Sequence, residues 1–207
     1  MIDLIKKEVK LAFTENKFPI IASVLILFIP LILGYVFEPY LFSYFNPVVE
    51  DLTNKVQSGV LQLTFNDIFF NNIRIVLEMF IGGLFFCFSA LILAFNGFFV
   101  GYYVATTPNL TQSLVLIIPH GIFEFSSCIL GCASGFVLFS FAYGALKTFL
   151  SQNGMGFVDR MVFSYDENFN RLLHAFILLA ISSVLMFIAA IIEVYLTVPI
   201  GRFLLSI

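Results

Sequence analysis

The chain contains runs of apolar residues that are long enough to cross a lipid bilayer. The clearest run extends over 20 residues from Phe18 to Phe37, and similar runs cover 121–146 and 172–199. Because an α-helix rises about 1.5 Å per residue, about 20 residues span a hydrocarbon core of roughly 30 Å. Hydrophobic residues make up 60% of the chain and charged residues only 11%, unlike a soluble domain. The sequence therefore predicts an all-α integral membrane protein, a polytopic helix bundle with one membrane domain over residues 1–207.

Residues 96–119 are the least clear part of this membrane domain. After an expected second crossing over 72–95, an apolar stretch of about twelve residues follows, and a second, shorter stretch ends at Pro119. Neither stretch alone spans roughly 30 Å of hydrocarbon. The sequence therefore predicts either about five crossings with a short or broken third segment that starts at a turn near Asn96, or a re-entrant hairpin.

The distribution of basic residues favours five crossings over the re-entrant hairpin. With five crossings, seven of the ten Lys and Arg residues lie on the side of the amino terminus, whereas a hairpin would divide them five and five. Basic residues concentrate on the cytoplasmic side of membrane proteins. We therefore expect a multi-pass protein of the cell membrane with a cytoplasmic amino terminus and a carboxyl terminus outside. The seven residues are Lys6, Lys7, Lys10, Lys17, Lys147, Arg160 and Arg171, opposite Lys55, Arg74 and Arg202.

Two polar segments are expected to lie outside the hydrocarbon core. Residues 1–17 place apolar side chains at three- and four-residue steps with lysines on the other side, typical of an interfacial helix or of a solvated helix end. Residues 38–71 form the longest polar region, in which Asn46 and Pro47 indicate the start of a short amphipathic helix on the outer face. That helix would pack on the bundle or offer a docking surface, through Val48, Leu52, Val56 and Val60 at four-residue spacing.

Ionisable side chains within the apolar segments are the candidate functional residues, because such groups are costly at membrane depth. His120 and Glu124 are four residues apart and share one helix face. Cys128 lies one turn further along the same face. We expect a buried hydrogen-bonded network that fixes how the helices meet. The alternative is a proton or ion pathway, as in transporters that build sites at interrupted helices. The expected members are Asn72, Asn96, His120, Glu124 and Glu193, while His174 is interpreted as a boundary residue.

The stripe of histidine, glutamate and cysteine also raises the question of a metal site. Imidazole, carboxylate and thiolate all ligate zinc, but neither a His-Glu-x-x-His nor a Cys-x-x-Cys spacing occurs in the sequence. One helix supplies at most two adjacent ligands, so the others would have to come from other helices. The expectation is therefore no metal and no cofactor.

Small residues and a proline predict how the helices pack and where they are interrupted. Gly97 and Gly101 are four residues apart, a spacing that lets helix backbones approach closely. Pro119 and Gly121 are expected to break the helical segment around them.

Signatures of soluble enzymes are missing from the sequence. It has no glycine-rich phosphate loop, no G-x-S-x-G turn and no Ser-x-x-Lys motif, so we expect no enzyme and no catalytic residues. The formal net charge of −3 also argues against a general basic surface of the kind that binds nucleic acid.

Four stretches resemble the stage II sporulation protein M family: NNIR from Asn71, FNGFFVG from Phe95, IPHGIFE from Ile118 and IIEVYLTVP from Ile191. This resemblance implies a polytopic inner-membrane protein, commonly with five spans. The family's namesake is a membrane partner of peptidoglycan-degrading proteins in spore engulfment, although many relatives belong to organisms that do not sporulate. The motif positions that the resemblance implies are Asn72, Asn96, Gly97, Pro119, His120, Gly121, Glu124 and Glu193.

These features together favour a non-catalytic scaffold or partner in a complex of the cell envelope. Its expected partners are the lipid bilayer and other membrane or envelope proteins, and self-association stays open. The alternative function is a small transporter or channel that uses the buried His and Glu residues. A third, an intramembrane metal-dependent hydrolase, would use His120, Glu124 and Glu193.

Overall fold

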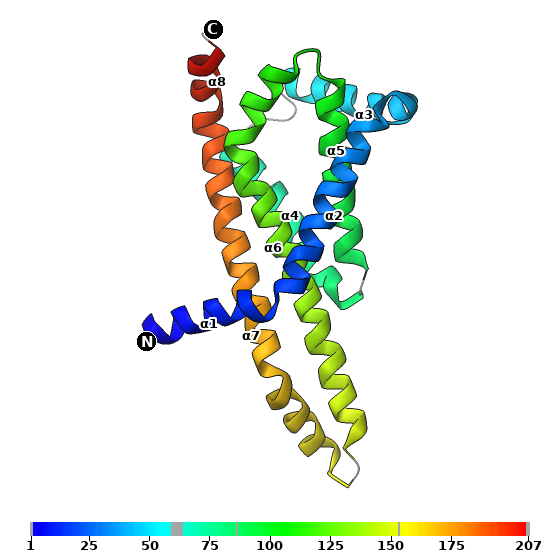
Figure 1. Ribbon diagram of the computed structural model, residues 1–207, viewed down its shortest axis with the longest axis vertical. Coiled ribbons are helices and arrows are strands. Elements are labelled where there is room, and N and C mark those ends of the chain that lie inside the picture. The colour runs from blue at the N-terminus through cyan, green and yellow to red at the C-terminus, as the bar shows by residue number, and fades with distance from the viewer. Residues whose placement is uncertain (1, 59–63, 86, 153, 206–207) are drawn as a thin grey trace.

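The computed structural model describes residues 2–58, 64–85, 87–152 and 154–205, and the secondary structure in this part of the chain is entirely helical. Five segments are long and apolar enough to cross a membrane, which confirms the predicted all-α bundle of five spans (Figure 1). They are α2 (Lys17–Val36), α4 (Phe65–Gly82) with η1 (Gly83–Phe85), α5 (Phe88–Thr106), α6 (Leu110–Ser151), and α7 (Phe157–Ile191) with η2 (Ile192–Leu196) and α8 (Thr197–Leu205).

The second and third spans have different boundaries from those expected. The second span covers Phe65–Phe85 rather than 72–95, and the third is the unbroken helix α5 rather than a segment that starts at a turn near Asn96. The polar Asn96 lies inside α5 and donates a hydrogen bond from Nδ2 to Cys128 Sγ of α6 at 3.8 Å. The α4 helix ends instead at an apolar glycine pair, because Gly83 lies so close to the Gly135 backbone that no side chain fits between them.

The expected helix break at Pro119 and Gly121 is also wrong. The α6 helix continues through Pro119 for 42 residues, and the turn before it lies at 107–109, where Asn109 Oδ1 accepts a hydrogen bond from the Gln112 N–H at 3.1 Å. The re-entrant hairpin is thereby excluded. Transmembrane helices tolerate proline because surrounding groups compensate for the one lost backbone hydrogen bond.

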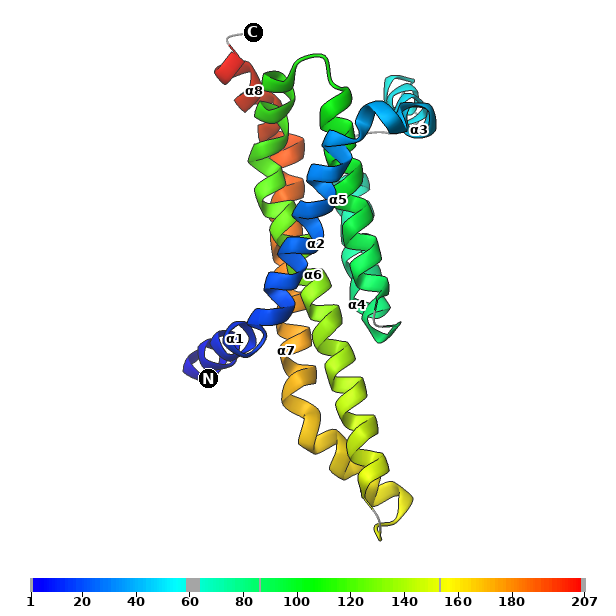
Figure 2. The ribbon, with the colours of Figure 1, turned by 45° about the vertical axis from the view of Figure 1, so that its right-hand side comes forward.

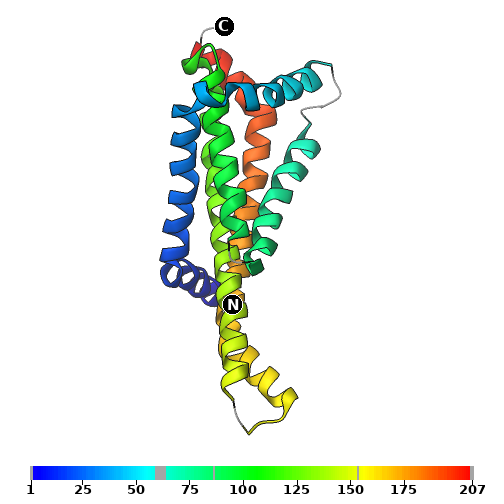
Figure 3. The ribbon, with the colours of Figure 1, turned by 90° about the vertical axis from the view of Figure 1, so that its right-hand side faces the viewer.

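Two helices lie across the bundle at opposite ends of α2 (Figures 1 and 3). The α1 helix (Ile2–Glu15) is the predicted amphipathic amino-terminal helix, and α3 (Glu38–Gln57) lies at the other end. The 20 residues of α2 rise about 30 Å, the thickness of a hydrocarbon core, so α1 and α3 mark the two membrane faces.

The helix in the polar segment is longer than predicted. It begins at Glu38 rather than at Asn46, and Pro47 lies inside it. Its Phe45 ring packs against Tyr102 of α5 with the ring centroids 5.4 Å apart, which holds this part of α3 on the bundle. Of the predicted apolar stripe, Val60 and the side chains of Leu52 and Val56 lie outside the described residues.

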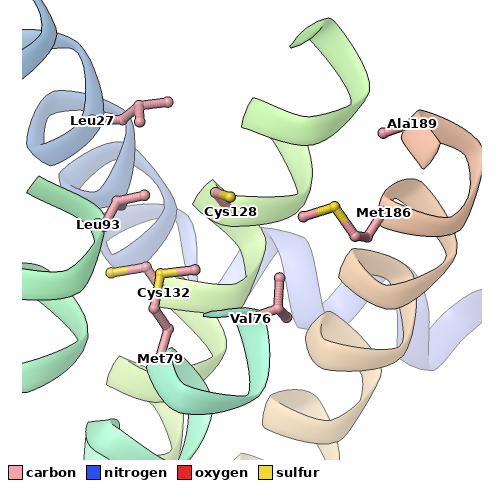
Figure 4. Packing of buried hydrophobic residues seen from close by; sticks show 8 residues of the cluster. All are labelled: Leu27, Val76, Met79, Leu93, Cys128, Cys132, Met186 and Ala189. Carbon is pink, nitrogen blue, oxygen red and sulfur yellow. The ribbon is translucent and has the colours of Figure 1, made fainter. Parts of the chain in front are cut away.

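The core of the bundle lies where α6 meets α2, α4, α5 and α7. The α6 and α7 helices run side by side, and each of Ser127 and Ser182 donates a hydrogen bond to the other's carbonyl oxygen, at 2.8 and 2.7 Å. Gly97 and Gly101 bring α5 against the backbone of α2. Figure 4 shows the largest buried cluster, which contains Leu27, Val76, Met79, Leu93, Cys128, Cys132, Met186 and Ala189.

The α6–α7 pair extends well beyond the level of α1 (Figures 1–3). The level of α1 is marked by a pocket that Asn16 shares with Ser140 and Arg171. Since α6 alone rises about 63 Å over its 42 residues, it is about twice as long as a hydrocarbon core is thick. We call the part beyond α1, residues 141–151 and 157–170, the distal hairpin.

Candidate functional site

Three ionisable side chains from two spans converge inside the bundle. His120 and Glu124 come from α6, and Glu193 comes from η2 at the end of α7. A ring nitrogen of His120 and one carboxylate oxygen from each glutamate lie within 4.8 Å of one another, and all three residues are partly buried. The structure thus brings together the histidine and both glutamates of the expected network.

The cluster lies in the half of the membrane nearer to the carboxyl terminus. Gly97, the neighbour of Asn96, packs against Leu27 close to the middle of α2, so the contact between Asn96 and Cys128 marks the centre of the bilayer. At about 1.5 Å per residue along α6, Glu124 lies about 6 Å and His120 about 12 Å from this level. The cluster is therefore within reach of the membrane surface that carries α3.

The backbone changes its winding at Glu193. Residues Ile192–Leu196 form a π-helical turn, in which the Thr197 N–H donates to the Ile192 carbonyl oxygen. The Thr197 hydroxyl donates to the same carbonyl at 3.1 Å. Turns of this kind are rare in α-helices and concentrate at functional sites.

Thr197 also contacts the His120 ring. Its Oγ1 lies 3.2 Å from His120 Nδ1. In the tautomer in which the Thr197 hydroxyl donates to the Ile192 carbonyl and accepts from Nδ1–H, Nε2 keeps its lone pair. Sequence reasoning missed Thr197, although its four-residue spacing from Glu193 was a usable signal.

The two carboxylates of the cluster have no hydrogen bond and no ion pair within the described part of the chain. An Arg–Glu ion pair does occur on the surface of α4, where Arg74 Nε lies 2.7 Å from Glu78 Oε1. Carboxylates at membrane depth normally pair with cations or with several donors. A pair of unpartnered glutamates beside an imidazole acceptor can hold either shared protons or a cation.

The two asparagines of the expected network lie elsewhere. Asn72 accepts a hydrogen bond from Asn71 Nδ2 at 3.4 Å on α4, outside the cluster. Asn96 faces Cys128 and lines a lateral groove of about 500 Å³ between α4 and α5, together with Glu78. The five residues therefore divide into a cluster of three and two separate asparagines.

Comparison with known proteins assigns the chain to a family. The model of the family described as "Stage II sporulation protein M" matches residues 22–198, most of the chain and all three residues of the cluster. The chain belongs to this family.

An uncharacterized protein of Methanocaldococcus jannaschii is 30% identical to this family member over 195 residues, which cover 92% of this chain and 99% of the relative. No solved structure matches it. Neither the family description nor the name of the relative indicates an enzymatic activity.

A second polar cluster in this family member joins α1 to α7. His174, interpreted from the sequence as a boundary residue, is only 3% exposed. Asn16 Nδ2 donates to its Nδ1 at 3.4 Å, and carboxylate oxygens of Glu15 and Glu8 lie 3.6 and 3.9 Å from its ring nitrogens. The carboxylates that meet His174 are far away in sequence, so only the fold shows that it docks the surface helix α1.

The distal hairpin carries a third feature, an apolar groove of about 410 Å³. The two helices are held together there by aromatic contacts, including an edge-to-face pair between Phe149 and Phe157. The Ser164 hydroxyl is buried in the groove wall and has no hydrogen-bond partner within the described residues. The groove is lined by Phe141, Ala145, Leu146, Phe149, Phe157, Met161, Ser164 and Tyr165.

Proposed function

We propose that this family member is a non-catalytic membrane scaffold whose distal hairpin binds a membrane or envelope protein. The observation that carries the proposal is the apolar groove on a helical projection that extends beyond the level of α1. Contiguous apolar surface outside the membrane is characteristic of sites that bind other proteins.

The composition of the distal hairpin supports its position in water. Asp159, Asp166 and Glu167 are exposed on α7 within it, and such charges are costly in hydrocarbon. Large apolar side chains are nevertheless exposed alongside these charges. They include Tyr143, Leu146, Leu150, Phe157, Val158, Met161, Val162, Phe163, Tyr165 and Phe169.

The basic residues support a cytoplasmic position for the distal hairpin. Lys147 and Arg160 lie in the hairpin, and Lys6, Lys7 and Lys10 lie on α1, at the same end of the bundle. Because basic residues concentrate on the cytoplasmic side, the amino terminus and the hairpin face the cytoplasm, and α3 and the carboxyl terminus face outward.

The shape of the groove fits one apolar helix of a partner. Two antiparallel helices present a furrow into which a third helix packs with its apolar face, the usual mode of helix-in-groove recognition.

Site-specific photo-crosslinking in cells tests this function. A photoreactive amino acid at Met161, which lines the groove, should crosslink to one defined partner protein, and Met161→Glu should abolish co-purification of that protein in mild detergent. The matched control is Val162→Glu, since Val162 is 55% exposed on the same helix but does not line the groove. Crosslinks to lipid alone would refute the scaffold, and crosslinks between two copies of this chain would identify the groove as a self-association surface.

The cluster of His120, Glu124 and Glu193 keeps a second function open, a proton-coupled transporter. Titratable groups at membrane depth mark many ion pathways. Glu124→Gln should abolish flux in a transporter, measured in proteoliposomes with a pH-sensitive dye, and should leave partner binding by a scaffold unchanged.

A further inference from the structure

We propose that His120, Glu124 and Glu193 bind one divalent transition-metal ion of the zinc type within the membrane. The three residues belong to two spans that are separated by about 70 residues of sequence, yet their ligand atoms lie within 4.8 Å of one another. This site is independent of the distal hairpin and of the proposed scaffold function. The sequence alone argued against it, because the three ligands follow no recognised spacing.

The chemistry of the ligands selects the class of ion. Imidazole nitrogen and carboxylate oxygen are the donors that Zn²⁺ and its neighbours in the first transition series take, whereas Mg²⁺ and Ca²⁺ prefer oxygen alone. Zinc forms bonds of about 2.0–2.2 Å, so the ligand atoms of one tetrahedral ion lie about 3.3–3.6 Å apart. Small rotations of the two flexible glutamate side chains would close the remaining gap.

The balance of charge also favours a divalent cation. Glu124 and Glu193 would bring two negative charges into a region of low dielectric, and neither carboxylate has a cationic partner within the described residues. An ion of charge +2 neutralises both carboxylates at once. Protonation of both carboxyl groups is the competing way to remove the charge, so the ion has to displace these protons.

Thr197 prepares the histidine for metal binding. Its hydroxyl lies 3.2 Å from His120 Nδ1, and when it accepts from Nδ1–H the Nε2 lone pair is free for the ion. Ligating histidines generally donate their other ring N–H to such a partner, which fixes the ring orientation. The π-helical turn at Ile192–Leu196 holds Glu193 and Thr197 in this arrangement.

Three protein ligands leave a fourth position of a tetrahedral ion free for water or for another ligand. The site is also displaced toward the membrane surface that carries α3, which gives an ion a short path from the aqueous phase.

Metal titration of the full chain in detergent tests the site. After treatment with a chelator, the wild-type protein should bind one equivalent of Zn²⁺, measured by elemental analysis after dialysis, and Co²⁺ should give the visible absorption of a tetrahedral complex. Glu193→Gln preserves the side-chain shape and should weaken Zn²⁺ binding at least 100-fold. Glu78→Gln, a control for a membrane carboxylate outside the cluster, should bind like the wild type.

Variants of Thr197 and of the two glutamates separate a residue that positions a ligand from the ligands themselves. Thr197→Val should retain the Co²⁺ spectrum with about tenfold weaker binding, because it removes a positioning contact and no ligand. Gel filtration and circular dichroism identify variants that fail to fold, and Glu193→Gln and Glu124→Gln each provide an isosteric test. Less than one tenth of an equivalent of Zn²⁺ in the wild type, or equal affinity in the wild type and in both folded glutamine variants, would overturn the proposal.

Discussion

The α6–α7 pair is built differently on the two sides of α1. Within the bundle, its polar groups face inward, as Ser127 and Ser182 do in their paired hydrogen bonds, and its exposed side chains are apolar, such as Val184. In the distal hairpin, many exposed side chains are apolar as they are in the bundle, but exposed charged residues lie among them. The lipid explains the apolar surface in the first region, and the proposed scaffold function assigns the surface in the second region to a bound protein.

This difference also separates two kinds of stability. In the bundle, close approach of backbones and interhelical hydrogen bonds hold the helices together, because lipid removes the hydrophobic driving force between them. In the distal hairpin, aromatic contacts such as Phe149 on Phe157 add to an interhelical hydrogen bond from Asn168 Nδ2 to Thr148 Oγ1 at 3.3 Å. Substitutions in the bundle should therefore affect folding, and substitutions on the hairpin surface should affect binding.

The largest effect is expected where α5 meets α2. A side chain at Gly101 would meet the Leu31 carbonyl oxygen, so Gly101→Ala should force the helices apart and destabilise the protein by about 2–3 kcal/mol. Thermal unfolding in detergent measures this loss. Gly121→Ala is the matched control, because its added methyl group would meet Ile117 at an ordinary 3.4 Å and should not destabilise the protein. Equal unfolding temperatures in the two variants would contradict the close α2–α5 contact.

A smaller effect is expected at the paired serines. Ser127→Ala removes the hydrogen bond to the Ser182 carbonyl at 2.8 Å, and should cost about 1 kcal/mol, as interhelical hydrogen bonds in membranes do. Ser126→Ala serves as control, because the Ser126 hydroxyl bonds only to the Ile122 carbonyl of its own helix. Chemical unfolding of both variants decides whether the bond between helices matters more than the bond within one.

The smallest effect on folding is expected in the groove. Met161 is 54% exposed, so Met161→Gln should change the free energy of unfolding by less than about 0.5 kcal/mol. The same variant should release the bound partner in a co-purification assay. A substantial loss of stability would show that Met161 belongs to the folded core, and retention of the partner would remove the distinction between the two regions.

The helices that consist of long apolar runs could be predicted from the sequence. The predicted boundaries were wrong where a polar residue inside a helix was interpreted as a turn. The α2 helix follows directly from the run after Lys17, and the shared face of His120 and Glu124 follows from their spacing. Asn96 resembled a turn because its amide is polar, but a contact with Cys128 on another helix places it inside a span. The true end of α4 does carry a local signal, the glycine pair Gly82–Gly83, although the residues around it are apolar.

The candidate site shows the same limit. That Glu193 would approach His120 was expected, whereas the absence of the asparagines and the presence of Thr197 depend on how α6 and α7 are rotated against each other. The π-helical turn at Ile192–Leu196 sets this rotation locally, and nothing in its composition distinguishes it from an α-helix.

Labelling of single cysteines tests the difference between the two regions most directly. Val162 in the distal hairpin and Val184 in the bundle are 55% and 58% exposed on the same helix. Each is changed to cysteine in a Cys87→Ala background, since Cys87 is the exposed native thiol. A membrane-impermeant maleimide applied to inverted vesicles should label Val162→Cys and leave Val184→Cys unlabelled. Protection of Val162→Cys in vesicles stripped of bound proteins, or its labelling only from outside intact cells, would contradict a cytoplasmic hairpin in water.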